Sequence, residues 1–257
     1  MKYANPLIQK PLLSTFLGIA FFCSCQPNAP TPPPSPMPLS VTLKDTLRLN
    51  PSAKTYAATK AAVNRRRQAL NTAYAAGRIT LDSVRQAFTN TLLNDIIPYW
   101  YGTDWSFEGH TTVPRSGQIA CGYFVSTTLL DAGLRLNRFR LAQQAPEVEA
   151  KMLSFGKEVI VLNSDSPYSA AALLAQQLQE GLYFIGLGSS HVGYLLKHDG
   201  QLTAIHSNYV MPSEVVAQPI LESVYVGFGT FYLADITWND QLLKYWLKGA
   251  DVPLRGE

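Results

Sequence analysis

The sequence predicts an α+β fold in which helical segments come first and a small antiparallel sheet follows. Residues 52–77 are rich in alanine, and apolar residues recur at helical spacing through residues 80–96. Apolar runs within residues 183–206 are instead separated by Gly and Asp-Gly, which is typical of strands joined by tight turns. Cys121 lies between the two parts, just ahead of a further helical run.

Length and charge limit the classes of function. The chain has 257 residues and a formal net charge of +3, which is long enough for one or two domains with a real core. Without Lys2 and Lys10, which precede an apolar run near the amino terminus, 19 basic residues stand against 18 acidic ones. This near balance gives no electrostatic basis for binding nucleic acid, so we expect no nucleic-acid partner.

Residues 1–25 are predicted to be a lipoprotein signal peptide. A positively charged start is followed by the apolar run 12–22, which has the length of a signal sequence and is too short to span a bilayer. Ser24-Cys25 resembles the end of a bacterial lipobox, so Cys25 is the predicted lipidation site. An ordinary cleaved signal is the alternative. Either kind of signal exports the protein. A lipoprotein signal also anchors it to a membrane of the bacterial envelope, periplasmic or outer-membrane.

Three further segments follow the signal. Residues 26–40 form a proline-rich linker, which favours an extended spacer without a core of its own. Residues 41–98 are a helical amino-terminal segment, with Pro98 expected to end its second helix. The basic run 65–67 is interpreted as a solvated helix face. Residues 99–257 are expected to form the functional domain.

An aromatic loop precedes the cysteine. Residues 99–107 are dense in aromatic, glycine and polar residues and follow neither helical nor strand spacing. Two interpretations stay open: the rings line a cleft, or they plug the core beneath the next helix. Under the first, Tyr101 and Trp105 are candidate substrate-binding residues. His110, in the polar loop that follows, is expected at the surface.

Cys121 is the candidate nucleophile. Once the signal is removed it is the last thiol in the chain, so it forms neither an internal disulfide nor a cysteine-rich metal site. At the start of a helix, the helix dipole and nearby backbone N–H groups are expected to favour its thiolate. Thiolate chemistry needs a base, normally a histidine. We expect no metal and no cofactor.

A predicted hairpin supplies the histidines. His191 begins one strand, Asp199-Gly200 is the favoured pair for a two-residue loop, and the return strand ends near His206. In that register Gly193 faces His206 and His191 faces Asn208, so the two histidines are diagonal neighbours on one face. The sequence therefore predicts His191 as base, with His206 or Asn208 as its orienting partner. A one-residue slip would move His206 to the other face.

These motifs resemble the NlpC-type cysteine peptidases, papain-like hydrolases of the cell wall. In that family a Tyr/Trp-Gly-Gly-type loop precedes a helix beginning Asp-Cys-Ser-Gly, and a His-Val-Gly strand and a strand with a polar residue follow. Here Tyr101-Gly102-Thr103, Cys121, His191-Val192-Gly193 and His206 match in that order. The resemblance covers about residues 100–209. It implies a papain-like domain with the catalytic cysteine at a helix amino terminus, packed against a small antiparallel sheet, and no cofactor.

The resemblance also carries functional expectations. It implies an exported thiol hydrolase that cleaves amide bonds in peptidoglycan stem peptides by Cys-His-His catalysis, and Ser190 and Asn208 join the candidate substrate-binding residues. Ala120 stands where the family has Asp, and Gly122 where it has Ser; those neighbours help to recognise a free amine of the stem peptide. The departures favour an alternative, a related amidase or acyltransferase on another substrate. A non-catalytic envelope lipoprotein that uses the fold as a binding module is the third hypothesis.

The remaining segments are expected to complete the domain. Residues 140–167 are predicted to supply an inserted helix and strand. Residues 223–229 and 231–234 are predicted strands, and residues 238–246 a short closing helix.

Overall fold

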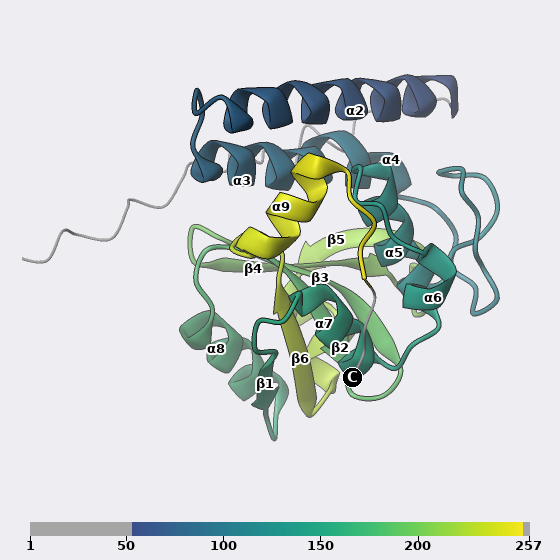
Figure 1. Cartoon of the computed structure of the whole chain (residues 1–257). Helices are drawn as coiled ribbons and strands as arrows, with labels where there is room; N and C mark the ends of the chain where they lie inside the picture. Colours follow the sequence, from purple (N-terminus) through teal and green to yellow (C-terminus); the bar gives the residue numbers. More distant parts are fainter. Residues whose placement is uncertain (1–52, 254–257) are drawn as a thin grey trace, which may run out of the picture. The chain divides into compact units, whose positions relative to one another are not determined.

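The protein forms an α+β fold around a fully antiparallel sheet, as predicted (Figure 1). The structure is a computed structural model that describes residues 53–253. The predicted signal peptide, its lipidation site Cys25 and the proline-rich linker lie outside the described residues. Within residues 53–253, no helix combines the length and apolar character needed to cross a bilayer.

The described chain is all-helical as far as residue 154, and the six strands follow, four of them in succession, with a few helices among and after them. The helices are α2 (Ala53–Ala75), α3 (Leu81–Asn90), the π-helical η1 (Thr91–Ile96), α4 (Ile97–Trp100), α5 (Cys121–Asp131), α6 (Arg138–Ala142), α7 (Pro146–Ser154), α8 (Pro167–Gln177), the short 3-10 turns η2 (Ile220–Glu222) and η3 (Val224–Gly227), and α9 (Asp240–Lys248). The strands are β1 (Ile160–Asn163), β2 (Gly181–Leu187), β3 (His191–His198), β4 (Gln201–Ser207), β5 (Val215–Pro219) and β6 (Thr230–Asp235). The six strands lie in the order β1-β6-β2-β3-β4-β5.

Both faces of the sheet are buried. Neighbouring residues of a strand point to opposite faces, and in β2 Phe184 packs into a cluster with α5, whereas Tyr183 packs into a second cluster with α8. The first cluster also contains Val63 and Phe88 from the amino-terminal helices, and Trp100. The helices of residues 53–100 therefore share one core with the sheet.

The first helices depart from the prediction at Pro98. As expected, Thr80 caps α3, with its hydroxyl accepting a hydrogen bond from the Ser83 N–H at 3.2 Å. Pro98 does not end the second helix, because the chain passes through the π-helical turn η1 and Pro98 falls in the first turn of α4. A first-turn N–H has no intrahelical partner, so proline removes nothing there.

The basic run 65–67 is a solvated face only in part. Arg67 donates through Nη1 to the carbonyl oxygens of Trp246 at 3.1 Å and Leu247 at 2.8 Å, at the carboxyl end of α9. Arg66 forms an ion pair with Asp95 of η1, and Arg65 is exposed. The interpretation as a solvated face is confirmed for Arg65 and Arg66, which are exposed, and is wrong for Arg67, because helix-end carbonyls lie within its reach.

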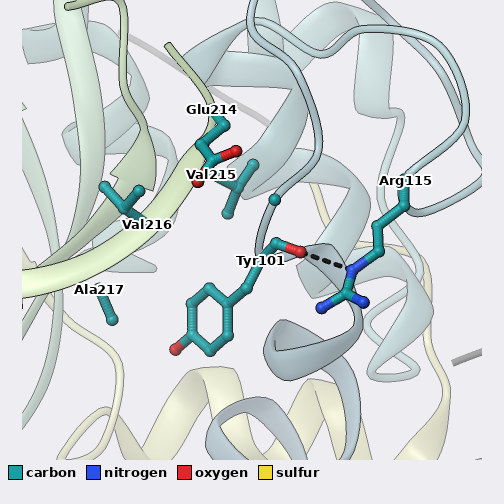
Figure 2. Close-up of a pocket in the computed structure, with 7 residues that line it drawn as sticks. Tyr101, Arg115, Glu214, Val215, Val216 and Ala217 are labelled. Carbon is teal, nitrogen blue, oxygen red and sulfur yellow. Dashed lines mark hydrogen bonds between the residues drawn. The ribbon is translucent and has the colours of Figure 1, made fainter. Parts of the chain in front are cut away.

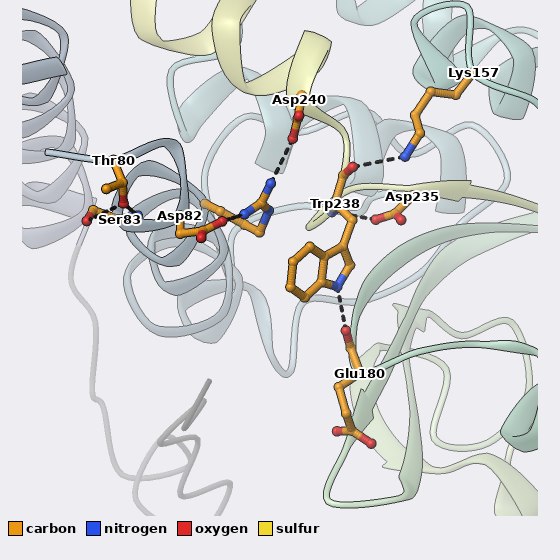
Figure 3. Close-up of polar contacts among 9 residues, drawn as sticks. Thr80, Asp82, Ser83, Lys157, Glu180, Asp235, Trp238 and Asp240 are labelled. Atoms are coloured by element: carbon orange, nitrogen blue, oxygen red, sulfur yellow. Dashed lines mark hydrogen bonds and ion pairs between the residues drawn. The ribbon is translucent and has the colours of Figure 1, made fainter. Parts of the chain in front are cut away.

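A network of polar contacts fastens α3 to the sheet and to α9 (Figure 3). The Arg85 guanidinium donates to Asp240 at 2.7 Å and lies 4.5 Å from the centre of the Trp238 ring. The Trp238 indole N–H donates to the Glu180 carbonyl at 2.7 Å, and Lys157 Nζ donates to the Trp238 carbonyl at 2.9 Å. One tryptophan thus joins segments before β1, before β2 and after β6.

The carboxyl-terminal predictions are confirmed in part. Strand β6 and helix α9 form close to the expected ranges. Residues 223–229 are not a strand: the Ser223 hydroxyl accepts a hydrogen bond from the Tyr225 N–H at 3.3 Å and begins the 3-10 turn η3. The 140–167 segment supplies α6, α7 and β1. Strand β5 is not among the predicted elements.

Candidate active site

The hairpin between β3 and β4 has the predicted register. Asp199 and Gly200 have φ values of 50° and 74°, as a two-residue loop of this kind requires, and the pairing runs from His198↔Gln201 to Tyr194↔Ile205. His191 and His206 therefore share a face, and His191 Nε2 lies 2.8 Å from His206 Nδ1. Both rings are buried, and their planes are nearly perpendicular, at 78°.

Asn208 is not the partner of His191. Its side chain is held by its own loop, donating to the Pro212 carbonyl at 3.1 Å and accepting from the Val210 N–H at 3.3 Å. Of the two predicted orienting residues, only His206 contacts His191 by a hydrogen bond.

The segment before α5 contacts strand β4 just beyond the end of the β3–β4 pairing. That pairing stops at Tyr194↔Ile205, while β4 continues to pair with β5 as far as Ser207. The Ser207 hydroxyl donates to the Ile119 carbonyl at 2.7 Å, two residues before Cys121. The backbone N–H of Val192, next to His191, lowers the pKa of the Cys121 thiol. Helix α5, which begins at Cys121, packs against the two strands that carry the histidines.

The electrostatic environment of Cys121 differs from the expectation. Its pKa is raised to about 11: burial is the largest cause and the Glu149 carboxyl adds to it, while the N–H groups of Val192, Gly122 and Cys121 itself act in the opposite direction. The predicted thiolate at rest is therefore wrong, because the loss of hydration outweighs the helix terminus. The residue is nevertheless partly exposed. At neutral pH the sulfur is a thiol, so its reaction depends on a neighbouring base.

Both histidines are neutral near pH 7. Burial lowers the pKa of His191 to about 4. Burial and the neighbouring charge of His191 lower the pKa of His206 to about 2. A neutral imidazole has a free lone pair for accepting a proton. Among the described residues, His206 Nε2 is buried and has no hydrogen-bond partner.

Aromatic rings enclose the histidine pair. Tyr225 lies beneath it, with ring centres 4.8 Å from His206 and 6.1 Å from His191. The Tyr225 hydroxyl lies within hydrogen-bonding distance of the carbonyls of Tyr194 at 3.2 Å and Ile205 at 3.4 Å, on the two paired strands. A Cβ on Gly193 would stand 2.0 Å from that hydroxyl and 2.8 Å from His206 Cβ. Gly193 leaves room beside His206, as predicted, and Tyr225 fills it.

Glu149 is a functional candidate that sequence reasoning missed. It lies in the first turn of α7 and is buried, and its Oε2 has no partner within residues 53–253. Burial raises its pKa well above the usual value. A Cβ on Gly122 would stand 3.1 Å from Glu149 Oε1, so the glycine after Cys121 leaves space for the carboxyl. The only signal in the sequence was its place in the 140–167 segment, which was predicted to supply an inserted helix and strand.

The candidate substrate-binding residues are scattered. Trp105 lies near the site, because its ring is 6.1 Å from that of Tyr209, which lies 5.2 Å from the His191 ring. Ser190 is exposed in the turn before His191. Tyr101 lines a separate cavity of about 430 Å³ (Figure 2). The two interpretations of the aromatic loop each hold for part of it, since Trp100 is a core residue.

The candidate catalytic residues line none of the three cavities described below. The cavity at Tyr101 and two others of about 590 and 610 Å³ are not lined by Cys121, His191 or His206. In the described part of the chain, no group of three or more His, Cys, Asp or Glu residues is placed to hold a metal ion.

Comparisons of the chain with models of known families, with curated proteins and with solved structures find no match. We therefore infer the function of the protein from the geometry of Cys121, His191 and His206 and from the motifs in the sequence.

Proposed function

We propose that this protein is an exported thiol hydrolase with a papain-like, NlpC-type domain that cleaves amide bonds in peptidoglycan stem peptides. One observation carries the proposal: Cys121 begins a helix that packs against the two strands that bear the hydrogen-bonded pair His191–His206. A nucleophile, a base and a residue that orients the base are the minimum set for this chemistry.

The roles follow from the contacts. His191 accepts the Cys121 proton as the sulfur attacks the carbonyl carbon of the amide. The backbone N–H of Cys121, at the helix start, is placed to hold the developing oxyanion. His191 then returns the proton to the departing amine, which leaves a thioester on Cys121. Water hydrolyses the thioester, with His191 taking a proton from the water, and releases the acid and the thiol.

This mechanism fixes a tautomer for the histidine pair. For His191 to offer Nδ1 to the thiol, its Nε2–H must donate to His206 Nδ1 across the 2.8 Å contact. His206 then carries its own proton on Nε2, the buried atom without a partner. His206 would thus hold the base in its working orientation at the cost of one unpaired donor.

The test compares the full-length protein with Cys121→Ala. Peptide release from isolated peptidoglycan fragments is followed by mass spectrometry. We expect the variant to lose hydrolysis entirely, and His191→Ala to lose at least about a hundredfold in rate. Thr72→Ala, at an exposed position on α2, is the control and should retain activity. Unchanged turnover by Cys121→Ala would refute the assignment.

A second candidate is a related amidase or acyltransferase acting on another acyl group. It is favoured by Ala120 and Gly122, which stand where the resembling family has Asp and Ser. A panel of muropeptides and other amide and ester substrates separates the two, since both predict loss of turnover with Cys121→Ala.

A third candidate is a non-catalytic envelope lipoprotein that uses the fold for binding. It is favoured by the burial that raises the pKa of Cys121 to about 11. Labelling with iodoacetamide across pH decides: a thiol activated by His191 reacts faster than in His191→Ala near neutral pH, whereas an inert thiol reacts equally in both.

A further inference from the structure

The cavity of about 430 Å³ at the edge strand β5 holds two opposite charges that do not meet. Its lining combines Tyr101, Gly102, Arg115 and residues 214–217. In Figure 2 the Glu214 and Arg115 side chains approach from different segments, with the Tyr101 ring and Ala217 below them. Val216 pairs with His206 across the sheet, so the cavity borders the strand of the candidate active site without including its residues.

The Arg115 guanidinium is held in place with its outer nitrogens available. Its Nε–H donates to the Tyr101 carbonyl at 2.7 Å, and its backbone N–H donates to the Thr103 hydroxyl at 2.9 Å. The backbone is in the left-handed region, with φ of 56°. In the described part of the chain, its two Nη groups have no partner. Such a preoriented fork suits a carboxylate.

Glu214 is anchored through its backbone, and its carboxylate is unpaired among the described residues. Its backbone N–H donates to the Pro212 carbonyl and its carbonyl accepts from the Asn208 N–H, both at 2.9 Å. The side chain is half-buried and forms no ion pair within residues 53–253.

The two charged groups face each other across Gly102. Arg115 Nε and Glu214 Oε2 each lie 3.9 Å from the point where a Cβ on Gly102 would stand, yet the described side chains form no ion pair with each other. The Arg115 Nε and Glu214 Oε2 atoms are therefore separated by at most about twice that distance. One small ligand that carries both charges can therefore contact both residues from the cavity.

We propose that this cavity binds the zwitterionic end of an amino acid, with an ammonium and a carboxylate on one carbon. The carboxylate would bind the Arg115 Nη groups and the ammonium would bind Glu214. An apolar side chain would pack on Val215, Ala217 and the Tyr101 ring. An anion alone is repelled by Glu214 and a cation alone by Arg115, so the paired charges select the zwitterion. The inference goes beyond the proposed hydrolysis and does not depend on Cys121.

The test measures binding of three matched ligands by isothermal titration. Full-length Cys121→Ala is used, so that failure of the hydrolase proposal and failure of this one are separate results. Leucine carries both charges, N-acetylleucine lacks the ammonium, and leucinamide lacks the carboxylate. We expect leucine to bind at least about tenfold tighter than either analogue, because each removes one charge-assisted contact.

Variants assign the contacts to residues. Arg115→Gln and Glu214→Gln should each weaken leucine binding about tenfold or more. Because each substitution removes the charge that repels one analogue, Arg115→Gln should strengthen leucinamide binding and Glu214→Gln should strengthen N-acetylleucine binding. Arg78→Gln and Glu158→Gln, both exposed and outside the cavity, are the matched controls. Ala217→Leu keeps both charges but fills the cavity, and should also weaken leucine binding.

Two results would overturn the inference. One is equal binding of leucine and its analogues, or no binding of leucine up to high millimolar concentration. The other is leucine affinity unchanged in Arg115→Gln, Glu214→Gln and Ala217→Leu. The Arg115 side chain is exposed and the Glu214 side chain is half-buried. Arg115→Gln and Glu214→Gln should therefore unfold at the same temperature as the control variants.

Discussion

At the scale of single residues, Glu149 is the side chain whose charge opposes the Cys121 thiolate. The carboxyl is buried beside Gly122, and it adds to the effect of burial in raising the pKa of the thiol to about 11. The pair is coupled, because ionising either group makes ionising the other less favourable. Position 149 therefore regulates how readily the sulfur gives up its proton.

Glu149→Gln should increase the reactivity of Cys121. Glutamine keeps the shape and removes the charge, so the pKa of the thiol falls below about 11. Each unit of fall gives about ten times more thiolate at a fixed pH well below the pKa. The rate of alkylation by iodoacetamide, measured from pH 7 to 10, reports the change.

Glu158→Gln is the control for charge alone, since Glu158 is exposed. Equal alkylation rates in Glu149→Gln and the unaltered protein, at every pH, would show that the carboxyl does not act on the sulfur.

Among the elements, the first and last described helices are joined by one arginine. Arg67 of α2 donates to the carbonyls of Trp246 and Leu247, where α9 ends at Gly249. A cation at a helix carboxyl terminus meets both unpaired carbonyls and the negative end of the helix dipole.

Arg67→Ala should lower the free energy of unfolding by about 1–3 kcal/mol, since two hydrogen bonds from a charged donor are lost. Urea unfolding measures it. Arg65→Ala is a matched control from the same basic run, because Arg65 is exposed. Equal losses in the two variants would mean that the contact with α9 contributes nothing.

Elements specified by local chemistry were predictable, and those specified by distant packing were not. The cap at Thr80 and the turn at Asp199-Gly200 are each encoded within a few residues. The 3-10 turn η3 is different. Its apolar run is typical of a strand, but the Tyr225 ring packs beneath His206 and its hydroxyl meets the Tyr194 carbonyl. No spacing rule in the local sequence predicts that the Tyr225 ring packs against His206.

For the whole molecule, the buried histidines make the free energy of unfolding depend on pH. In the unfolded chain a histidine titrates near 6.5, whereas in the folded protein the pKa of His191 is about 4 and that of His206 about 2. Between these values the unfolded chain binds protons that the folded protein does not. The free energy of unfolding is therefore largest above pH 6.5 and falls as the pH drops, by up to about 1.4 kcal/mol per unit for each histidine.

Glu149 opposes part of this trend. Its pKa is raised in the folded protein, so it contributes stability at low pH that is lost as the pH rises through its folded value. The net slope is therefore below the limit set by two histidines.

Urea unfolding at pH 7, 6 and 5 should show this loss of stability. His206→Gln should have a shallower slope than the unaltered protein, because one buried titrating group is removed. His198→Gln, at the hairpin turn with 25% of its side chain exposed, should keep the full slope. A flat profile in the unaltered protein would contradict the burial of neutral histidines.

The candidate site was predictable as far as strand geometry extends. The side-chain period of two, combined with the Asp-Gly loop, correctly placed His191 beside His206. The state of Cys121 was not predictable, since its pKa depends on burial and on Glu149 from a distant helix. The local sequence shows that Cys121 begins a helix, where the dipole favours the thiolate. It does not show the burial of the sulfur, whose desolvation outweighs that effect on the pKa.

The attachment of α2 to α9 has a mechanical consequence. Helix α2 packs on α3, η1 and α9, and Arg67 ties it to the last turn of α9. A pulling force transmitted through the amino-terminal side of α2 reaches Tyr56 and Lys60 before Arg67, and both contact Asp131 at the end of α5. Tension on the leading end of α2 would therefore reach the helix that begins at Cys121 through Asp131, and α9 through Arg67.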